Sequence, residues 1–359
     1  MYLLSFLVFL IIGIKSDIVT IPINEYYYGI FNPLLTFPQE NINYSILLNT
    51  FNSYSVFWLD FTLIKSHILK DQEKLQLNSM KVCYLYQTDI QFQSVVLKDF
   101  FFYVGREALC RNDVGISLGY HIKDETFSIV HSLYNKNIIN KLQFAFENPG
   151  TKNKAFFHIG GLPLNKQRDF PYKGIIRINE TLPSWGFTLD SIKYNDKEYK
   201  MNIPCLVHSA MENMFVSEKL FRFLSHTIFN DTTKYQQTST NIFKQFKAPI
   251  KGEIEFKFEE MKLKLNLDVL FNQSESQFVI ESEAFHNFSG IFLGSKFLYL
   301  FNYSLFDFEN KQIEFYSDTI IISNDNNQQL NPILFPLISV NIVLCFIECL
   351  VLFYYKIIN

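Results

Sequence analysis

The sequence predicts an all-β protein with a few short helices. The chain has 359 residues, 39 of them Phe and 20 Tyr, and aromatic residues favour strands over helices. Between the two ends of the chain, apolar residues occur in short or alternating stretches broken by clusters of Asn, Asp, Gly and Pro, a pattern typical of strands and turns. The length suffices for one large domain or two ordinary ones.

The predicted elements can be placed along the chain from these patterns. Strands are expected at residues 94–104, 154–159, 174–178 and 253–267. The last of these alternates Glu, Lys and apolar residues, which indicates a half-exposed strand or a hairpin. Apolar residues at helical spacing favour a helix at 217–229 and, more weakly, at 127–136.

Apolar runs at both ends predict export and membrane attachment. Residues 1–16 are expected to be a signal peptide, because their apolar run is too short to span a bilayer; a buried first strand is the alternative. Residues 333–355 are long enough to span a membrane, with a polar linker at 323–332 and a short tail at 356–359. A lipid-anchor signal attached near Ser323 is the alternative. Glu348 and Lys356 favour the spanning helix.

The cysteines and glycosylation motifs agree with a secretory route. Of the five cysteines, Cys83 and Cys110 flank a candidate hairpin and are candidates for a disulfide in an oxidising compartment, whereas Cys205 has no evident partner. Asn-x-Ser/Thr sequons occur at Asn43, Asn179, Asn230, Asn272, Asn287 and Asn302. We therefore expect a single-pass glycoprotein with a lumenal or extracellular body.

Charge and residue spacing argue against several classes of function. The net charge is −3 and the Lys and Arg residues are scattered without a basic stripe, so no nucleic-acid partner is expected. His and Cys residues are too sparse for a metal-binding motif, and no Gly-rich phosphate loop is present. We expect neither a metal nor a cofactor. The sequence does not indicate an oligomeric state.

Two apolar strands run into short polar turns, one in each half of the chain. The first leads into Asn49-Thr50-Phe51 and the second into His208-Ser209-Ala210. Downstream of each, an apolar residue is followed by glycine, at Leu118-Gly119 and Leu293-Gly294. The same short pattern therefore occurs once in each half of the chain.

The ordered set of motifs resembles the pepsin-like aspartic peptidases, in which an apolar strand runs into Asp-Thr/Ser-Gly once in each half. Trp58 occupies the place of the Trp that follows the first catalytic turn, and Tyr86 that of the tyrosine in the flap hairpin. Further matching segments are residues 27–29, 37–39, 83–89 with 95–99, 113–120, 157–161, 172–174 with 185–192, 290–298 and 306–315. The resemblance implies a bilobal pepsin-like (acid protease) fold over residues 25–317, with lobes at residues 17–175 and 176–322. The C-terminal transmembrane helix is added to this fold.

The resemblance fails at the residues that carry the chemistry. The family needs two carboxylates that share one proton, and the corresponding positions here are Asn49 and His208. The glycines that let the two turns approach each other are replaced, one of them by Phe51, which is expected to splay or refill the junction. The flap glycines are replaced by Gln87 and Asp89, so that hairpin must turn or lie differently. No catalytic residue is assigned.

The expected function is therefore a membrane-anchored, non-catalytic ectodomain. Its interlobe cleft would bind a peptide or protein segment, with Trp58, Tyr86 and Phe51 as lining residues. One alternative is an active aspartic-type endopeptidase with non-standard catalytic residues; a nucleophilic Ser209 activated by His208 is a further possibility. The other is a structural or adhesive surface protein with a filled cleft, which Phe51 favours.

Overall fold

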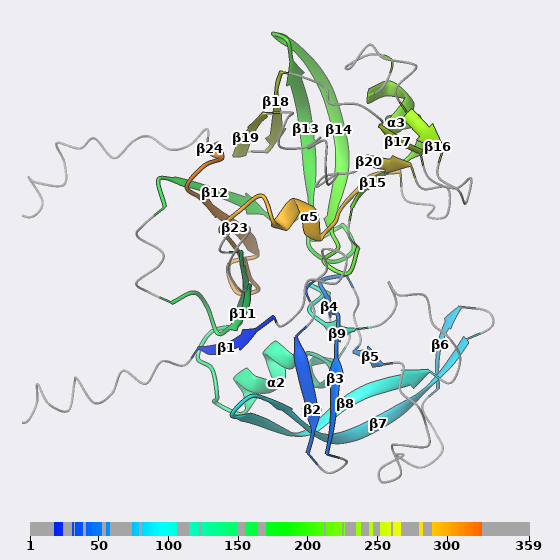
Figure 1. The fold of residues 1–359 in the computed structure, drawn as a ribbon, viewed down its shortest axis with the longest axis vertical. Coiled ribbons are helices and arrows are strands. Elements are labelled where there is room, and N and C mark those ends of the chain that lie inside the picture. Colours follow the sequence, from blue (N-terminus) through cyan, green and yellow to red (C-terminus); the bar gives the residue numbers. More distant parts are fainter. Residues whose placement is uncertain are drawn as a thin grey trace, which may run out of the picture.

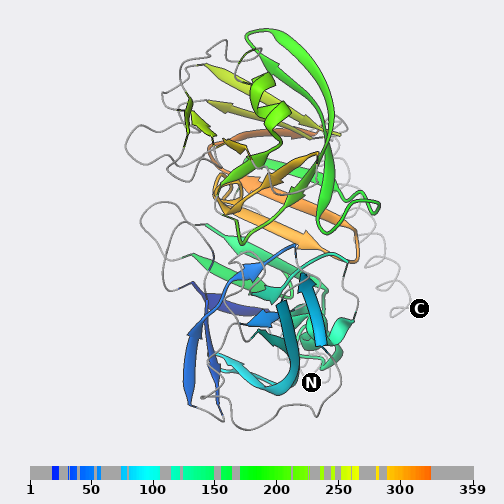
Figure 2. The same ribbon diagram turned by 90° about the vertical axis from the view of Figure 1, so that its right-hand side faces the viewer.

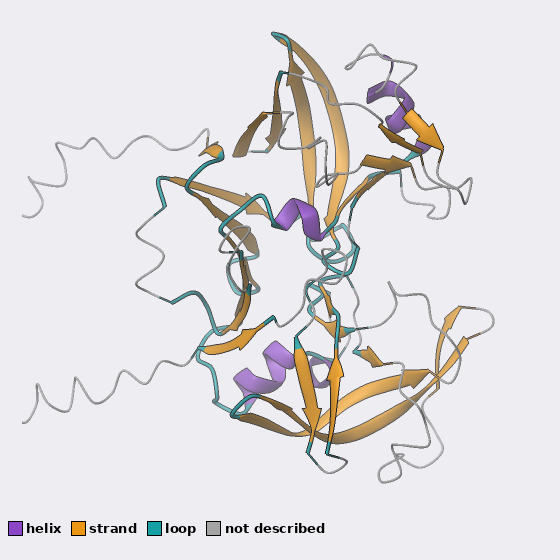
Figure 3. Cartoon of the chain, in the orientation of Figure 1, coloured by secondary structure: helices purple, strands orange, loops and turns teal. Residues whose placement is uncertain are grey.

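The structure of the chain is a computed structural model. It describes residues 18–23, 31, 33–38, 41–51, 55–57, 74–78, 81–105, 115–121, 124–148, 155–163, 170–211, 213–224, 226, 235–237, 244–246, 252–259, 261–266, 280–282 and 289–324. These residues form mostly strands with few short helices (Figure 3). The predicted all-β class is confirmed.

Two β lobes lie at opposite ends of the molecule, with a central sheet between them (Figures 1 and 2). The sheet of the amino-terminal lobe has the strand order β3-β2-β7-β8-β5, with β6 paired to β7. Its strands are β2 (Leu34–Phe37), β3 (Ile42–Ser45), β5 (Val56–Phe57), β6 (Lys74–Asn78), β7 (Lys81–Phe92) and β8 (Val95–Gly105).

The carboxy-terminal lobe contains an eight-stranded sheet of order β20-β15-β21-β14-β13-β18-β19-β24. Its strands are β13 (Gly186–Tyr194), β14 (Lys197–Val207), β15 (Met214–Val216), β18 (Glu253–Phe258), β19 (Met261–Asn266), β20 (Ile280–Ser282), β21 (Ile291–Leu293) and β24 (Ile321–Asn324). Strands β16 (Tyr235–Gln237) and β17 (Lys244–Phe246) pair with each other. β24 extends into the predicted linker, because Ser323 pairs with Lys262 of β19.

The central sheet takes strands from both halves of the chain, in the order β1-β11-β10-β22-β23-β12. Its strands are β1 (Val19–Pro22), β10 (Gln143–Glu147), β11 (Phe156–Ile159), β12 (Tyr172–Arg177), β22 (Tyr303–Asp307) and β23 (Gln312–Ser317). The halves meet where β10 pairs with β22, and there the rings of Phe144 and Phe306 stack with centroids 4.6 Å apart. This sheet therefore packs the two lobes into one apolar core.

Both predicted helices form within the described residues, and serine side chains cap them. Helix α2 (Ile129–Asn135) begins after Ser128, whose hydroxyl accepts a hydrogen bond from the backbone N–H of His131. Helix α3 (Glu218–Phe223) begins after Ser217, whose hydroxyl accepts from the N–H of Leu220. Both are ordinary N-caps. A 3₁₀ turn (Glu125–Phe127) precedes α2, and the short α5 (Ser295–Leu298) follows β21.

The predicted strands also form, and residues 253–267 prove to be a hairpin. Strands β18 and β19 pair in antiparallel register from Glu253↔Asn266 to Phe258↔Met261. Glu259, in the turn between them, has a φ of 48°. The alternation seen in the sequence continues through both strands, with one residue of each successive pair buried.

The hairpin predicted from residues 83–89 and 95–99 forms, and its tip lies beyond Gln87 and Asp89. Strand β7 runs through Gln87 and Asp89 to Phe92, with a shift in its register to β8 at Asp89. The turn to β8 falls at Gln93 and Ser94. Gln93 supplies the left-handed backbone, with a φ of 53°. The strand is longer than expected because its buried alternation runs on through Tyr86, Thr88, Ile90 and Phe92.

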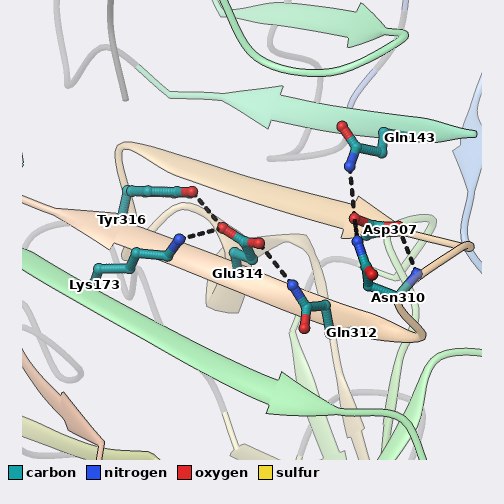
Figure 4. A network of polar contacts seen from close by, with 7 residues as sticks. All are labelled: Gln143, Lys173, Asp307, Asn310, Gln312, Glu314 and Tyr316. Atoms are coloured by element: carbon teal, nitrogen blue, oxygen red, sulfur yellow. Dashed lines mark hydrogen bonds and ion pairs between the residues drawn. The ribbon is translucent and has the colours of Figure 1, made fainter. Parts of the chain in front are cut away.

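The second face of the central sheet carries buried polar groups beside a small apolar cluster that includes Tyr303 and Leu305. Glu314 lies at the centre of a network in which it accepts hydrogen bonds from the side chains of Gln312 and Tyr316 and pairs with Lys173, whose Nζ is 2.6 Å from Oε2 (Figure 4). Next to it, Asp307 accepts from Gln143 at 2.6 Å and from Asn310 (Figure 4). Buried carboxylates of this kind are tolerated when hydrogen bonds and counter-charges satisfy them.

The Tyr316 phenol should make stability depend on pH in the alkaline range. Burial and the adjacent Glu314 carboxylate raise the pKa of Tyr316 above its usual value near 10. The folded state therefore retains the proton more tightly than the unfolded state. The stabilisation that the protonated Tyr316 contributes to the folded state is fully present below pH ~10 and is lost as the pH rises further. Urea unfolding at several pH values should show the wild-type chain losing stability relative to Tyr316→Phe above pH ~10.

A matched substitution separates this effect from general alkaline unfolding. Tyr134→Phe alters a half-buried tyrosine on α2, outside the network. Its stability should follow that of the wild type across the same pH range. If Tyr316→Phe and the wild type show the same pH dependence, Tyr316 does not carry the expected linkage.

Several predicted features lie outside the described residues. These are the signal peptide, the span at 333–355, the tail at 356–359, Trp58, Cys110 and the sequons at Asn230, Asn272 and Asn287. Within the part of the chain that the structure describes, no helix has both the length and the apolar character needed to cross a membrane.

Candidate functional site at the junction of the lobes

The two degenerate positions lie at the ends of two equivalent strands. β4 (Leu48–Asn49) pairs in parallel with β9 (Ile116–Ser117), and the Asn49 carbonyl accepts a hydrogen bond from Leu118 N at 2.8 Å. β14 pairs in parallel with β21, and His208 N donates to the Leu293 carbonyl at 2.9 Å. The repeat seen in the sequence therefore corresponds to a repeated strand pair, one in each lobe.

Reciprocal hydrogen bonds join the two turns. Thr50 Oγ1 donates to the Val207 carbonyl at 2.9 Å and accepts from Ser209 N at 2.9 Å. Ser209 Oγ accepts from Thr50 N at 3.0 Å and donates to the Leu48 carbonyl. Each hydroxyl is thus donor and acceptor to the opposite lobe. Both side chains are fully buried, so these bonds hold the lobes together in a setting where an unmade bond is costly.

Asn49 has a structural role in its own turn. Its side chain is fully buried, and Oδ1 accepts a hydrogen bond from Phe51 N at 2.9 Å. A side-chain oxygen that accepts from the backbone two residues on is an Asx-turn, which stabilises a tight change of direction. The amide supplies this acceptor without an ionisable group. Asn49 therefore shapes the turn and cannot exchange a proton with a partner across the junction.

Phe51 fills the space between the turns. Its ring stacks on the His208 imidazole, with centroids 4.9 Å apart and planes at 13°, and meets Phe292 edge-on at 5.8 Å. His208 is only 2% exposed, whereas Phe51 is half-buried. Phe51 packs with Leu182 and Phe215 against the buried Leu206, Met211 and Phe292, a group that we call the Phe51 cluster. Because the reciprocal bonds remain intact, Phe51 refills the junction and does not splay it.

A further set of residues forms hydrogen bonds with the turns and with the segments next to them. The Ser184 hydroxyl donates to the Thr50 carbonyl, and Trp185 Nε1 donates to the Leu118 carbonyl at 2.6 Å. Ser55 Oγ donates to the Phe127 carbonyl and accepts from Ser117 N. No sequence motif marks Ser184 or Ser55, so their roles could not be predicted from the sequence.

At one position near these residues there is no room for a side chain larger than that of glycine. Gly115 has a φ of 143°, and a Cβ there would lie 2.6 Å from the Leu47 carbonyl oxygen and 3.2 Å from Asn49 Cβ. A side chain at this position would push β9 away from β4. The glycine was visible in the sequence only as part of a motif, so its closeness to Asn49 could not be read there.

The other residues proposed from the sequence do not gather at the junction in the described structure. Tyr86, expected to line a cleft, is 1% exposed and stacks on Phe102 in the core of the amino-terminal lobe. The physical reason is that β7 continues past it, so Tyr86 sits mid-strand on the buried face. Cys83 lies in β7, while its proposed partner Cys110 is outside the described residues. Cys205 is a buried free thiol whose pKa is raised by burial.

The chemistry available at the junction follows from these groups. One position is an amide, the other an imidazole covered by a phenyl ring, and the hydroxyls of Thr50 and Ser209 are committed to holding the lobes. Neither of these two side chains is a carboxylate. Among the described residues, no group of three or more His, Cys, Asp or Glu is placed to hold a metal ion.

The fold and the paired strand turns correspond to a known architecture. Two β lobes joined by a six-stranded sheet, each contributing one turn to the junction, form the architecture of the pepsin-like aspartic proteinases. A solved structure similar to this chain is the aspartic proteinase from Irpex lacteus, with a TM-score of 0.63 and 13% sequence identity over 84% of this chain and 98% of that chain. At this identity the likeness shows the fold. No family model and no curated protein matches the sequence.

Proposed function

We propose that this protein is a membrane-anchored, non-catalytic pepsin-fold protein, a pseudopeptidase that acts by contact and not by cleavage. The observation that most strongly supports this proposal is the arrangement of residues at the junction. Its cross-lobe hydrogen bonds are complete, yet the two strand ends present Asn49 and a His208 that is covered by Phe51. The side chains that would have to share a proton are absent while the surrounding scaffold is present. Fold inheritance does not require inheritance of activity.

The filled junction favours a structural or adhesive role over capture of a peptide at this position. His208 is buried beneath the Phe51 ring, so an incoming segment would meet Phe51 first. Binding of an extended segment is the second candidate, because Phe51 and Phe215 remain partly exposed on the Phe51 cluster. Half-exposed aromatic side chains are suited to holding apolar residues of a partner.

The membrane attachment and the secretory route rest on the sequence. The apolar run at residues 333–355 supports a single-pass anchor, and residues 1–16 support export, which together place the body on the lumenal or extracellular side. The polar segment before the span would let the lobes stand clear of the bilayer.

A peptide-library assay tests the proposal directly. The detergent-solubilised full chain is incubated with a diverse peptide library from acidic to neutral pH, with and without pepstatin. We expect no cleavage, because the aspartic-type mechanism needs two carboxylates to activate water. The same peptides in a labelled form measure binding. Pepstatin-sensitive cleavage by the wild-type chain would contradict the proposal.

Designed variants of the same chain test whether Phe51 fills the site. Asn49→Asp with His208→Asp restores two acids, and adding Phe51→Gly also removes the ring and restores backbone freedom. Any acid-dependent gain in cleavage should be larger in the triple variant than in the double variant. An equal gain in both would mean that Phe51 does not obstruct the junction.

A further inference from the structure

The turn between β12 and β13 carries one of the six sequons, Asn179-Glu180-Thr181. Leu182 N donates to the Asn179 carbonyl at 2.9 Å and closes the turn, while Asn179 N donates to the Gly186 carbonyl at 2.7 Å. Glu180 and Thr181 are exposed, and Asn179 is half-buried. The sequon therefore lies on the surface in a turn whose backbone bonds are made at both ends.

The asparagine side chain is held in one orientation by the threonine of the same sequon. Asn179 Oδ1 accepts from Thr181 N at 3.0 Å and from Thr181 Oγ1 at 2.7 Å. Both bonds engage the carbonyl oxygen of the amide. In the part of the chain that the structure describes, no residue accepts a hydrogen bond from Asn179 Nδ2, the atom to which a glycan is attached. The two side chains that define the sequon are thus already in contact.

The other two described sequons are built differently. Asn43 lies on the edge strand β3, where its Oδ1 accepts from Thr36 Oγ1 at 2.6 Å, across the strand pair. Asn302 uses its Oδ1 to accept from Asp318 N at 3.1 Å, and Ser304 of that sequon is buried within β22. In the Asn302 sequon the hydroxyl residue belongs to the central sheet, so it is inaccessible once the sheet has formed.

We propose that Asn179 is an N-glycosylation site and that its occupancy exceeds that of Asn302. This inference rests on the secretory route of the proposed function. In the transfer, a bond forms between Nδ2 and the first sugar carbon of a lipid-linked oligosaccharide. The bond from that carbon to the lipid diphosphate breaks, the amide loses one proton, and the diphosphate leaves. The exposed turn accommodates a glycan whether transfer precedes or follows folding.

A glycan at Asn179 would lie beside the junction. Leu182, three residues further on, packs in the Phe51 cluster, and Ser184 of the same segment donates to the Thr50 carbonyl. The bulky, hydrated sugar would therefore stand next to the partly exposed rings of Phe51 and Phe215 and restrict access to them.

Site-resolved mass spectrometry tests the inference. The full chain is produced in a eukaryotic secretory cell, treated with peptide-N-glycosidase in heavy-oxygen water, and digested, so that each formerly glycosylated asparagine is labelled. We expect Asn179 to be labelled and Asn302 to be labelled less. Thr181→Ala should abolish the label at Asn179, and Thr181→Ser should retain it. Ser304→Ala should leave the label at Asn179 unchanged.

The outcomes separate the two proposals. Labels at other sequons with none at Asn179 would overturn the inference and leave the secretory route intact. Equal labelling of Asn179 and Asn302 would overturn the ranking. No label at any of the six sequons in a chain recovered from the secretory membranes would overturn the inference alone. Recovery of the chain from the cytosol would overturn the secretory route, and the inference with it.

Discussion

Replacing Ser209 with alanine is expected to lower the free energy of unfolding by about 2–6 kcal/mol. The change removes the hydrogen bonds of Ser209 Oγ with Thr50 N and with the Leu48 carbonyl. Both backbone groups then remain buried without these partners, at a cost of about 1–3 kcal/mol each. Urea unfolding followed by circular dichroism gives the difference. The exposed Ser94→Ala, in the turn between β7 and β8, is the matched control and should change stability by less than about 0.5 kcal/mol.

A double-mutant cycle shows whether the bonds act across the junction. Thr50→Val removes the other hydroxyl, which bonds to Val207 and Ser209. Because the two hydroxyls form one network, the double variant should lose less stability than the sum of the single variants. Strict additivity would mean that the two residues stabilise their own lobes separately.

Trp185→Ala is expected to cost about 3–5 kcal/mol, as large-to-small changes of buried aromatic residues do. Trp185 is fully buried, and its ring meets those of Tyr120, Phe306 and Phe308 at centroid distances of 4.8–5.1 Å. The variant also leaves the Leu118 carbonyl without its 2.6 Å donor. The loss should appear in the midpoint of denaturant unfolding.

Two comparison variants show what the loss of stability in Trp185→Ala means. Trp185→Phe keeps much of the ring packing but lacks the indole N–H, so its loss should be smaller than that of alanine. Phe223→Ala removes a half-buried aromatic ring on α3, far from this contact in the chain, and should cost less than Trp185→Ala. If Trp185→Ala is no worse than Phe223→Ala, the tryptophan is not central to the packing between the lobes.

Sequence patterns were sufficient to predict the class of fold and several of its helices and strands. Alternation predicted the β18–β19 hairpin, and helical spacing predicted α2 and α3, because each pattern reflects burial of one face of a local element. The exact position of the turn after β7 was not predicted, because Gln87 and Asp89 look as well suited to a turn as Gln93 and Ser94 do. The strand continues to Phe92 since its buried residues keep their period of two.

Only part of the candidate site could be predicted from the sequence. The positions of Asn49 and His208 could be found because each follows an apolar strand. The bonds between Thr50 and Ser209 join residues 159 positions apart, and nothing local in either segment signals them. The contact of Phe51 with His208 likewise depends on how the lobes meet. The buried polar groups on the second face of the central sheet were also not anticipated. Among them, His158 Nε2 lies 2.7 Å from Glu147 Oε2.

The strand order of the central sheet has a consequence for synthesis on the ribosome. β10 is made in the first half of the chain, but its neighbour β22 is made much later, with Gln143 and Asp307 separated by 164 positions. Until then, one edge of β10 has no native partner, and Phe144 and Phe146 lack the cover of Phe306. The nascent amino-terminal half therefore cannot complete its fold on its own. It must be kept from pairing wrongly until the last strands emerge, as expected for a topology dominated by non-local contacts.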